Sequence, residues 1–312
     1  MPVHPAIAAR LPLLQDLPAD QDWLTLPEEA ASFFAPYGDY ALPTSVEVSE
    51  RRIDGPHGPV RLRLYRPRDV DGRVPGLLWA HGGAFIGGDL DMPEAHVVGA
   101  EIAARRGAVV ASVEYRLATE TVRYPVPLDD VVAAWEAFAG MADELGLDPA
   151  RLGIGGASAG ANLAAAAVLR ERDAGGRMPS ALLLAYPALH FPNPALQDDL
   201  AAEMRRLPAM LRFTARSTTE ITRAYLGRIT DIPSNLMPGL ADLTGLPVVR
   251  IVVSEYDDLR SSGELFAEQL TEAGVPVETT VAEGMLHGHL NLPPVRSMPE
   301  VSRSLDFLAE GL

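Results

Sequence analysis

The sequence predicts an α/β protein in which helices flank both faces of a mostly parallel central sheet. From about residue 76 onward, short apolar runs alternate with segments of helical pattern. The runs are apolar throughout, which is typical of strands buried on both faces of a parallel sheet. The chain has 312 residues, 47% of them hydrophobic. This length and composition are sufficient for a large core in one α/β domain.

An antiparallel hairpin is expected before the parallel part of the sheet. Residues 46–53 and 60–65 both alternate between polar and apolar side chains, and a segment rich in Gly and Pro, 54–59, separates them. Strict alternation with a turn between the two runs indicates paired strands with one face toward solvent.

The elements that follow are predicted from periodicity and from the residues that interrupt it. Strands are expected at 76–80, 108–113, 152–155, 181–185, 248–253 and 277–281. Helices are expected at 94–106, 127–145, 159–172, 262–274 and 297–310.

Two further segments are expected to cover the sheet. Residues 190–245 separate two strands by far more than a normal crossover and are helical in pattern at 196–210 and 214–226. A long insertion at the carboxyl end of a strand is typical of a cap. Residues 1–44, with a helical stretch at 22–34, are expected to form its N-terminal part. The α/β core would then consist of residues 45–189 and 246–312.

Composition excludes several classes of function. The net charge of −16 disfavours nucleic acids and anionic lipid surfaces as partners. The absence of cysteine excludes disulfides, thiolate zinc sites and cysteine nucleophiles. All 26 basic residues are arginine, which excludes lysine Schiff bases and a phosphate-binding Walker lysine. No leader pattern or apolar run of about 18–20 residues is present, so a cytoplasmic protein without a membrane span is expected.

Ser158 is the candidate nucleophile. It is the serine of a Gly-x-Ser-x-Gly pattern formed with Gly156 and Gly160, between the strand at 152–155 and the helix at 159–172. A sharp strand-to-helix turn would expose Ser158 at its tip, with small residues relieving the crowding. A glycine-rich packing contact is the alternative reading, which this strand–turn–helix context disfavours.

The loop after the strand at 76–80 supplies a candidate oxyanion hole. Acyl transfer places negative charge on an oxygen, and backbone N–H groups aimed at that oxygen stabilise it. The N–H groups of Gly82 and Gly83 are the expected donors, with Ala159 as the third. His81, at the start of the loop, is expected to brace it rather than act as a base.

The candidate base is His287, which follows the last predicted strand. An acid should precede this histidine in the chain, and Glu255, Asp257 and Asp258 all lie at the end of the strand at 248–253. Loops at the carboxyl ends of parallel strands converge, so these groups can meet Ser158. Neighbouring side chains at a strand end diverge, which separates Asp257 from Asp258.

A metal site is not expected. His287 and His289 form a His-x-His pair, but no acidic or cysteine partner stands at ligand spacing.

The motifs together resemble the hormone-sensitive-lipase-like branch of the α/β-hydrolases. The loop from His81 to Ala84, the elbow around Ser158, and the segments 114–120 and 124–130 occur in family order, and the likeness runs from about residue 60 to the C-terminus. The resemblance implies the α/β-hydrolase fold with a helical cap. It implies a serine carboxylesterase that cleaves short- to medium-chain esters through an acyl-enzyme, with Asp257 as the acid and no cofactor.

The resemblance is incomplete at a few positions and leaves other activities open. Ala157, Thr119 and Ser261 differ from the residues usual in that branch. Phe85 and Tyr186 are expected to contribute to a pocket for a small-molecule ester. A deacylase, thioesterase or amidase shares this chemistry, and a dehydratase-like member shares the fold. Oligomeric state is left open, and the resemblance is compatible with a homodimer.

Overall fold

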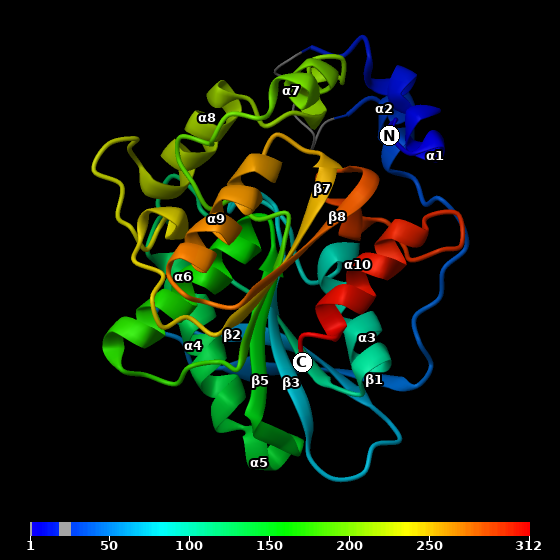
Figure 1. Ribbon diagram of the computed structural model, residues 1–312. Helices are drawn as coiled ribbons and strands as arrows, with labels where there is room; N and C mark the ends of the chain where they lie inside the picture. The colour runs from blue at the N-terminus through cyan, green and yellow to red at the C-terminus, as the bar shows by residue number, and fades with distance from the viewer. Residues whose placement is uncertain (1, 19–25) are drawn as a thin grey trace.

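An eight-stranded sheet forms the centre of the molecule, as the computed structural model shows for residues 2–18 and 26–312 (Figure 1). The strand order is β1-β2-β4-β3-β5-β6-β7-β8. The strands are β1 Val46–Ile53, β2 Val60–Pro67, β3 Val74–Ala80, β4 Val109–Glu114, β5 Leu147–Ala157, β6 Ala181–Ala185, β7 Val248–Tyr256 and β8 Val277–Leu286. The mostly parallel α/β sheet predicted from the sequence is confirmed.

The predicted hairpin is also confirmed. β1 pairs with β2 in antiparallel register, with Val46 opposite Pro67 and Ile53 opposite Val60. β2 then joins β4 in antiparallel fashion, and every later pairing in the sheet is parallel. The carboxyl ends of β3, β5, β6, β7 and β8 therefore lie at one edge of the sheet.

Helices cover both faces of the sheet (Figure 1). One face carries α3 Pro93–Arg106 and α10 Pro299–Ala309, which contact each other. The other carries α4 Val126–Gly140, α6 Ala159–Ala174 and α9 Arg260–Glu272. The helix predicted at 127–145 is divided, because α4 ends before Met141 and a separate turn, α5 Ala142–Leu145, follows.

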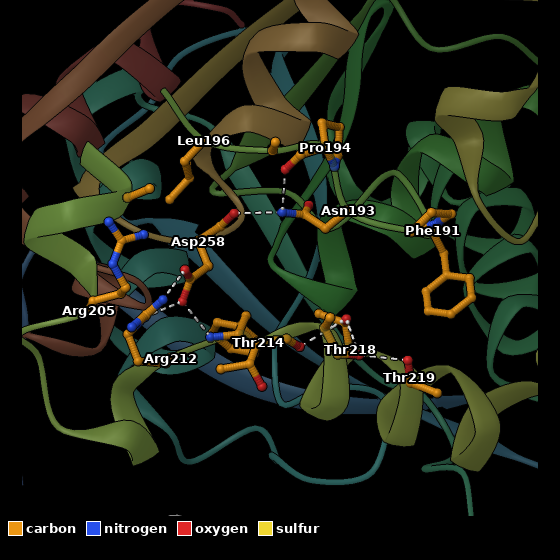
Figure 2. A pocket seen from close by; sticks show the side chains of 15 residues that line it. Phe191, Asn193, Pro194, Leu196, Arg205, Arg212, Thr214, Thr218, Thr219 and Asp258 are labelled. Atoms are coloured by element: carbon orange, nitrogen blue, oxygen red, sulfur yellow. Dashed lines mark hydrogen bonds and ion pairs between the residues drawn. The ribbon is translucent and has the colours of Figure 1, made fainter. Parts of the chain in front are cut away.

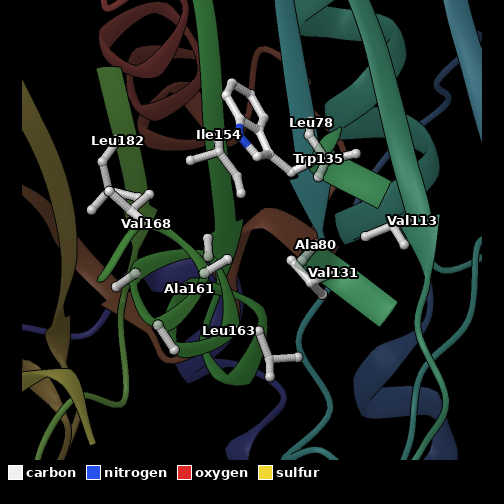
Figure 3. Packing of buried hydrophobic residues seen from close by; sticks show 14 of the residues in the cluster. Leu78, Ala80, Val113, Val131, Trp135, Ile154, Ala161, Leu163, Val168 and Leu182 are labelled. Carbon is white, nitrogen blue, oxygen red and sulfur yellow. The ribbon is translucent and has the colours of Figure 1, made fainter. Parts of the chain in front are cut away.

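Each face has its own hydrophobic cluster. Trp135 of α4 and Val168 of α6 pack against Ile154 and Leu182 of the sheet in the first cluster (Figure 3). Val98 of α3 belongs to the second. Burying apolar surface on both sides explains why these strands are apolar along their length.

The segment 190–245 lies over the carboxyl-end edge of the sheet (Figure 1). It contains α7 Asp198–Met204, α8 Ala215–Leu226 and the short 3₁₀ turns η4 Ala209–Leu211 and η5 Pro238–Leu240. Its predicted helices at 196–210 and 214–226 correspond to α7 with η4 and to α8.

The N-terminal part lies beside that segment in the same view (Figure 1). It contains α1 Pro5–Ala8, η1 Leu11–Leu14, α2 Glu28–Ala31 and η3 Ser32–Phe34. Of the helical stretch expected at 22–34, residues 22–25 lie outside the described residues. None of the described helices has both the length and the apolar character needed to cross a bilayer.

Candidate active site

Ser158 lies at a sharp turn between β5 and α6. Its backbone has φ 53° and ψ −115°, a conformation that L-residues rarely adopt and that is maintained only by the structure around it. A Cβ at Gly156 would lie 2.5 Å from the carbonyl carbon of Gly160, and one at Gly160 would collide with the carbonyl oxygen of Ala80. The two glycines therefore permit the turn, and the serine is held at the N-terminus of α6.

His287 and Asp257 form a hydrogen-bonded chain with this serine. His287 follows β8, and its Nε2 lies 2.9 Å from the Oγ of Ser158. Its Nδ1 lies 2.7 Å from Oδ2 of Asp257, which follows β7 and is buried. With Nδ1–H donating to the carboxylate, Nε2 is free to accept the serine proton. The structure thus brings together the three residues singled out in the sequence.

The other two acids at the end of β7 face elsewhere. Oε2 of Glu255 accepts the backbone N–H of Gly284 at 2.6 Å. The carboxylate of Asp258 accepts from Nε and Nη2 of Arg212 at 2.7 and 2.9 Å, and from the N–H of Phe213 at 2.8 Å. Asp257 and Asp258 therefore diverge, as expected for neighbours at a strand end.

The loop after β3 differs from expectation at Gly82. Its N–H donates to Oε2 of Glu94 at 2.6 Å and is therefore not available to an oxyanion. In the described part of the chain, the N–H groups of Gly83, Ala84 and Ala159 have no acceptor. Ala84 and Ala159 line the same cavity as Ser158. The geometry therefore favours Gly83, Ala84 and Ala159 over the set expected from the sequence.

Glu94 is a buried carboxyl group that sequence reasoning did not identify. It lies in α3, with 2% of its surface exposed. Its Oε1 accepts from the hydroxyl of Tyr186 at 2.5 Å and from Nδ2 of Asn291 at 3.1 Å. Burial raises the pKa of Glu94, while hydrogen bonds from Tyr186 and Gly82 act in the opposite direction. Glu94 thus links the loop after β3 to residues beside His287.

Of the two residues expected to contact substrate, the structure places only Phe85 in the cavity wall. Phe85 stacks on Tyr225 with ring centroids 4.0 Å apart. Tyr186 is fully buried and donates its hydroxyl to Glu94. Its ring packs edge-on against His287 at 4.9 Å, so it contacts the histidine without lining the cavity.

Two other histidines near the site have structural contacts. His81 is buried and stacks on Tyr115, whose hydroxyl donates to the carbonyl oxygen of His81 at 2.8 Å. Both ring nitrogens of His289 lie 2.9 Å from serine hydroxyls, those of Ser254 and Ser304. Burial lowers the pKa of His289 to about 3. Among the described residues, no group of three or more histidines and carboxylates is arranged to hold a metal.

A small cavity of about 40 Å³ adjoins Ser158. Its wall combines Ala84 and Phe85 with Ile221 and Met237 of the 190–245 segment.

Comparisons with known proteins agree with this fold. A family described as having the alpha/beta hydrolase fold matches residues 77–291. Esterase LipI and carboxylesterase NlhH of Mycobacterium tuberculosis are each 36% identical to this chain, over 78% and 74% of it and 75% and 72% of their own lengths. A hyperthermophilic esterase from Pyrobaculum calidifontis superposes with a TM-score of 0.81 at 31% identity, covering 99% of this chain and 97% of that one.

Proposed function

We propose, from the premise that this chain belongs to the hormone-sensitive-lipase-like α/β-hydrolases and is a carboxylic ester hydrolase, that it acts through a Ser158–His287–Asp257 triad. The observation that carries the proposal is the unbroken chain from Ser158 Oγ through both ring nitrogens of His287 to Asp257. An unassisted hydroxyl is a weak nucleophile, and an adjacent oriented base activates it.

The reaction proceeds in two steps. Oγ of Ser158 attacks the ester carbonyl carbon while its proton passes to Nε2 of His287. The C–O bond to the alcohol then breaks, and His287 returns the proton to the leaving oxygen, which gives an acyl-enzyme. In the second step His287 takes a proton from water, the water oxygen attacks the acyl carbon, and the acid leaves as Ser158 recovers its proton.

Negative charge on the carbonyl oxygen forms in both steps. The N–H groups of Gly83, Ala84 and Ala159 are the proposed donors to it, and the positive end of α6 adds to their effect. Asp257 stabilises the imidazolium and keeps the Nδ1–H tautomer in place.

We assign residues 45–189 and 246–312 to the catalytic core, and 1–44 and 190–245 to the cap. The cap supplies Ile221 and Met237 to the wall of the cavity beside Ser158. Because that cavity is small, about 40 Å³, the short end of the expected acyl range fits best. The cytoplasmic location stays a prediction, and the oligomeric state stays open.

A panel of p-nitrophenyl esters tests this assignment. We expect kcat/KM to be highest for acetyl to butanoyl esters and to fall for longer chains. Faster turnover of the hexadecanoyl ester than of the butanoyl ester would contradict the assignment. Ile221→Ala, which enlarges the cavity, should shift the preference toward longer acyl chains. Ile229→Ala is the matched control, because Ile229 is exposed and is not part of the cavity wall.

A further inference from the structure

A second, larger cavity of about 410 Å³ lies next to the one at Ser158. Phe191, Phe213 and Thr218 line both cavities, so the two adjoin each other. The larger one lies between the cap and the start of the loop after β7, with Pro194, Leu196 and Asp258 in its wall (Figure 2). At ten times the volume of the cavity beside Ser158, it is the space open to the bulkier part of an ester.

The boundary between the two cavities lies next to His287. Phe213 lines both cavities, and its ring packs against His287 with centroids 4.5 Å apart. His287 protonates the departing oxygen, and the alcohol group attached to that oxygen can extend past Phe213 into the larger cavity. The small cavity then takes the acyl part.

The charged residues in the wall of the larger cavity are Arg205, Arg212 and Asp258. Arg212 and Asp258 neutralise each other through two hydrogen bonds. The side chain of Arg205 has no acceptor or carboxylate within the residues that the structure describes. The wall therefore carries one uncompensated positive charge in a chain whose net charge is −16.

The neighbouring Arg206 shows that only one side of the chain at the end of α7 faces the cavity. Ala201 and Arg205 are one helical turn apart, and both line the cavity. Arg206 points elsewhere and pairs with Glu203 at 2.6 Å, with 73% of its side chain exposed. Figure 2 shows Arg205 and Arg212 on the same side of the cavity, with Phe191 on the opposite side.

We propose that this enzyme acts on esters whose alcohol part carries a carboxylate, which Arg205 binds at the far side of the larger cavity. The apolar body of the alcohol lies between Phe191 and Phe213, and the acyl group occupies the small cavity at Ser158. This inference rests on the proposed esterase function and specifies the substrate class for it. Charge-assisted hydrogen bonds to a guanidinium give both attraction and orientation.

Two matched esters test the proposal: 3-(4-acetoxyphenyl)propanoate and its neutral carboxamide. They share the acetyl group and the phenol leaving group, so they differ mainly in the charge presented to the cavity. We expect kcat/KM to favour the carboxylate about fivefold at low salt, as for a partly exposed ion pair. Added salt should reduce the ratio. Without a local cation, the net charge of −16 would favour the neutral ester instead.

Arg205→Gln should abolish the preference by raising KM for the carboxylate ester. Arg206→Gln should keep it, because that side chain lies outside the cavity wall. A wild-type kcat/KM ratio of carboxylate to carboxamide ester of one or less would overturn the proposal. So would an unchanged ratio in Arg205→Gln. Hydrolysis of p-nitrophenyl acetate but of neither matched ester would also overturn it. Failure to hydrolyse p-nitrophenyl acetate as well would instead contradict the esterase function itself.

Discussion

The loops that carry the triad and the cap above them are held in place by different kinds of contact. In the core, Asp257 and His287 directly follow paired parallel strands, and the N–H of Ser158 donates to the carbonyl of Ala185 at 2.9 Å. The cap is attached by side chains in addition to a few backbone bonds, such as the one from the N–H of Tyr124 to the carbonyl of Tyr225 at 2.8 Å. Asp258 holds Arg212, and the buried Asn162 donates to the carbonyl of Leu236 at 2.9 Å.

The two kinds of contact suit two different roles: the core loops carry out the reaction, and the cap selects the substrate. Backbone pairing fixes the triad atoms relative to one another, which a reaction with strict geometric demands requires. Side-chain attachments can change one at a time without disturbing the sheet. Substitutions in the core loops should therefore lower kcat for every ester, whereas substitutions in the cap should change which ester is preferred.

The largest expected effect comes from the serine–histidine pair. Ser158→Ala and His287→Ala should each lower kcat for p-nitrophenyl acetate by ~10⁴–10⁶, because the two act as one unit. The double variant should be no worse than the more damaging single one. Losses that add instead would show that Ser158 and His287 act independently. Circular dichroism and thermal unfolding would confirm that each variant is folded.

Substitution of the adjacent acids Asp257 and Asp258 compares the two regions directly, because Asp257 contacts His287 in the core and Asp258 contacts Arg212 in the cap. Asp257→Asn should lower kcat by ~10⁴, since the amide favours the wrong tautomer and stabilises the imidazolium less. Asp258→Asn should cost less than about tenfold in kcat, because Asp258 contacts Arg212 and Phe213 rather than His287. If a folded Asp258→Asn variant loses more kcat than Asp257→Asn, Asp257 is not the triad acid.

The buried His289 should make the stability of the folded protein fall at acid pH. Burial lowers its pKa to about 3, whereas in the unfolded chain it takes up a proton near pH 6.5. The unfolded state thus binds more protons below pH 6.5, and stability falls as the pH drops from 6.5 toward 3. We expect about 2 kcal/mol of this loss between pH 6.5 and 5.0 from His289 alone.

Urea unfolding of wild type and His289→Gln at both pH values measures that contribution. The variant should be less stable at pH 6.5 but should lose less stability on acidification. Equal losses in the two proteins would mean that His289 does not stay neutral in the folded state.

The smallest expected effect concerns the carboxyl group that braces the loop after β3. Glu94→Gln should lower kcat about tenfold, because it weakens the hydrogen bond that positions Gly82 and, with it, the N–H of Gly83. Glu101→Gln is the matched control, since Glu101 lies in the same helix but contacts Tyr40 and Arg105. Equal effects of both changes on kcat would indicate a general loss of helix stability.

The sequence predicted the parts of this molecule that depend on local pattern. Strand and helix positions followed from periodicity, Ser158 and His287 from motif order and the convergence of strand ends, and Asp257 from the family resemblance. Each depends on few neighbours, and those neighbours are close in the chain or are paired backbone.

The parts that could not be predicted depend on contacts between distant side chains. Gly82 stands in the expected loop, but a carboxylate twelve residues later occupies its N–H. Tyr186 follows a strand at the site, yet its hydroxyl is occupied by that same Glu94. Asp258 and Arg212 are 46 residues apart, and no sequence pattern indicates that they pair. An acidic residue in the helix after the loop, here Glu94, could have indicated a hydrogen bond that holds the loop in place.

Active-site labelling tests the central claim most directly. A fluorophosphonate at one equivalent should modify Ser158 and abolish hydrolysis of p-nitrophenyl acetate in proportion to the label, as measured by intact mass and peptide mapping. Ser158→Ala should remain unlabelled and inactive. Stoichiometric labelling of another serine, or more than a tenth of wild-type hydrolysis in Ser158→Ala, would contradict the assignment of Ser158 as the nucleophile.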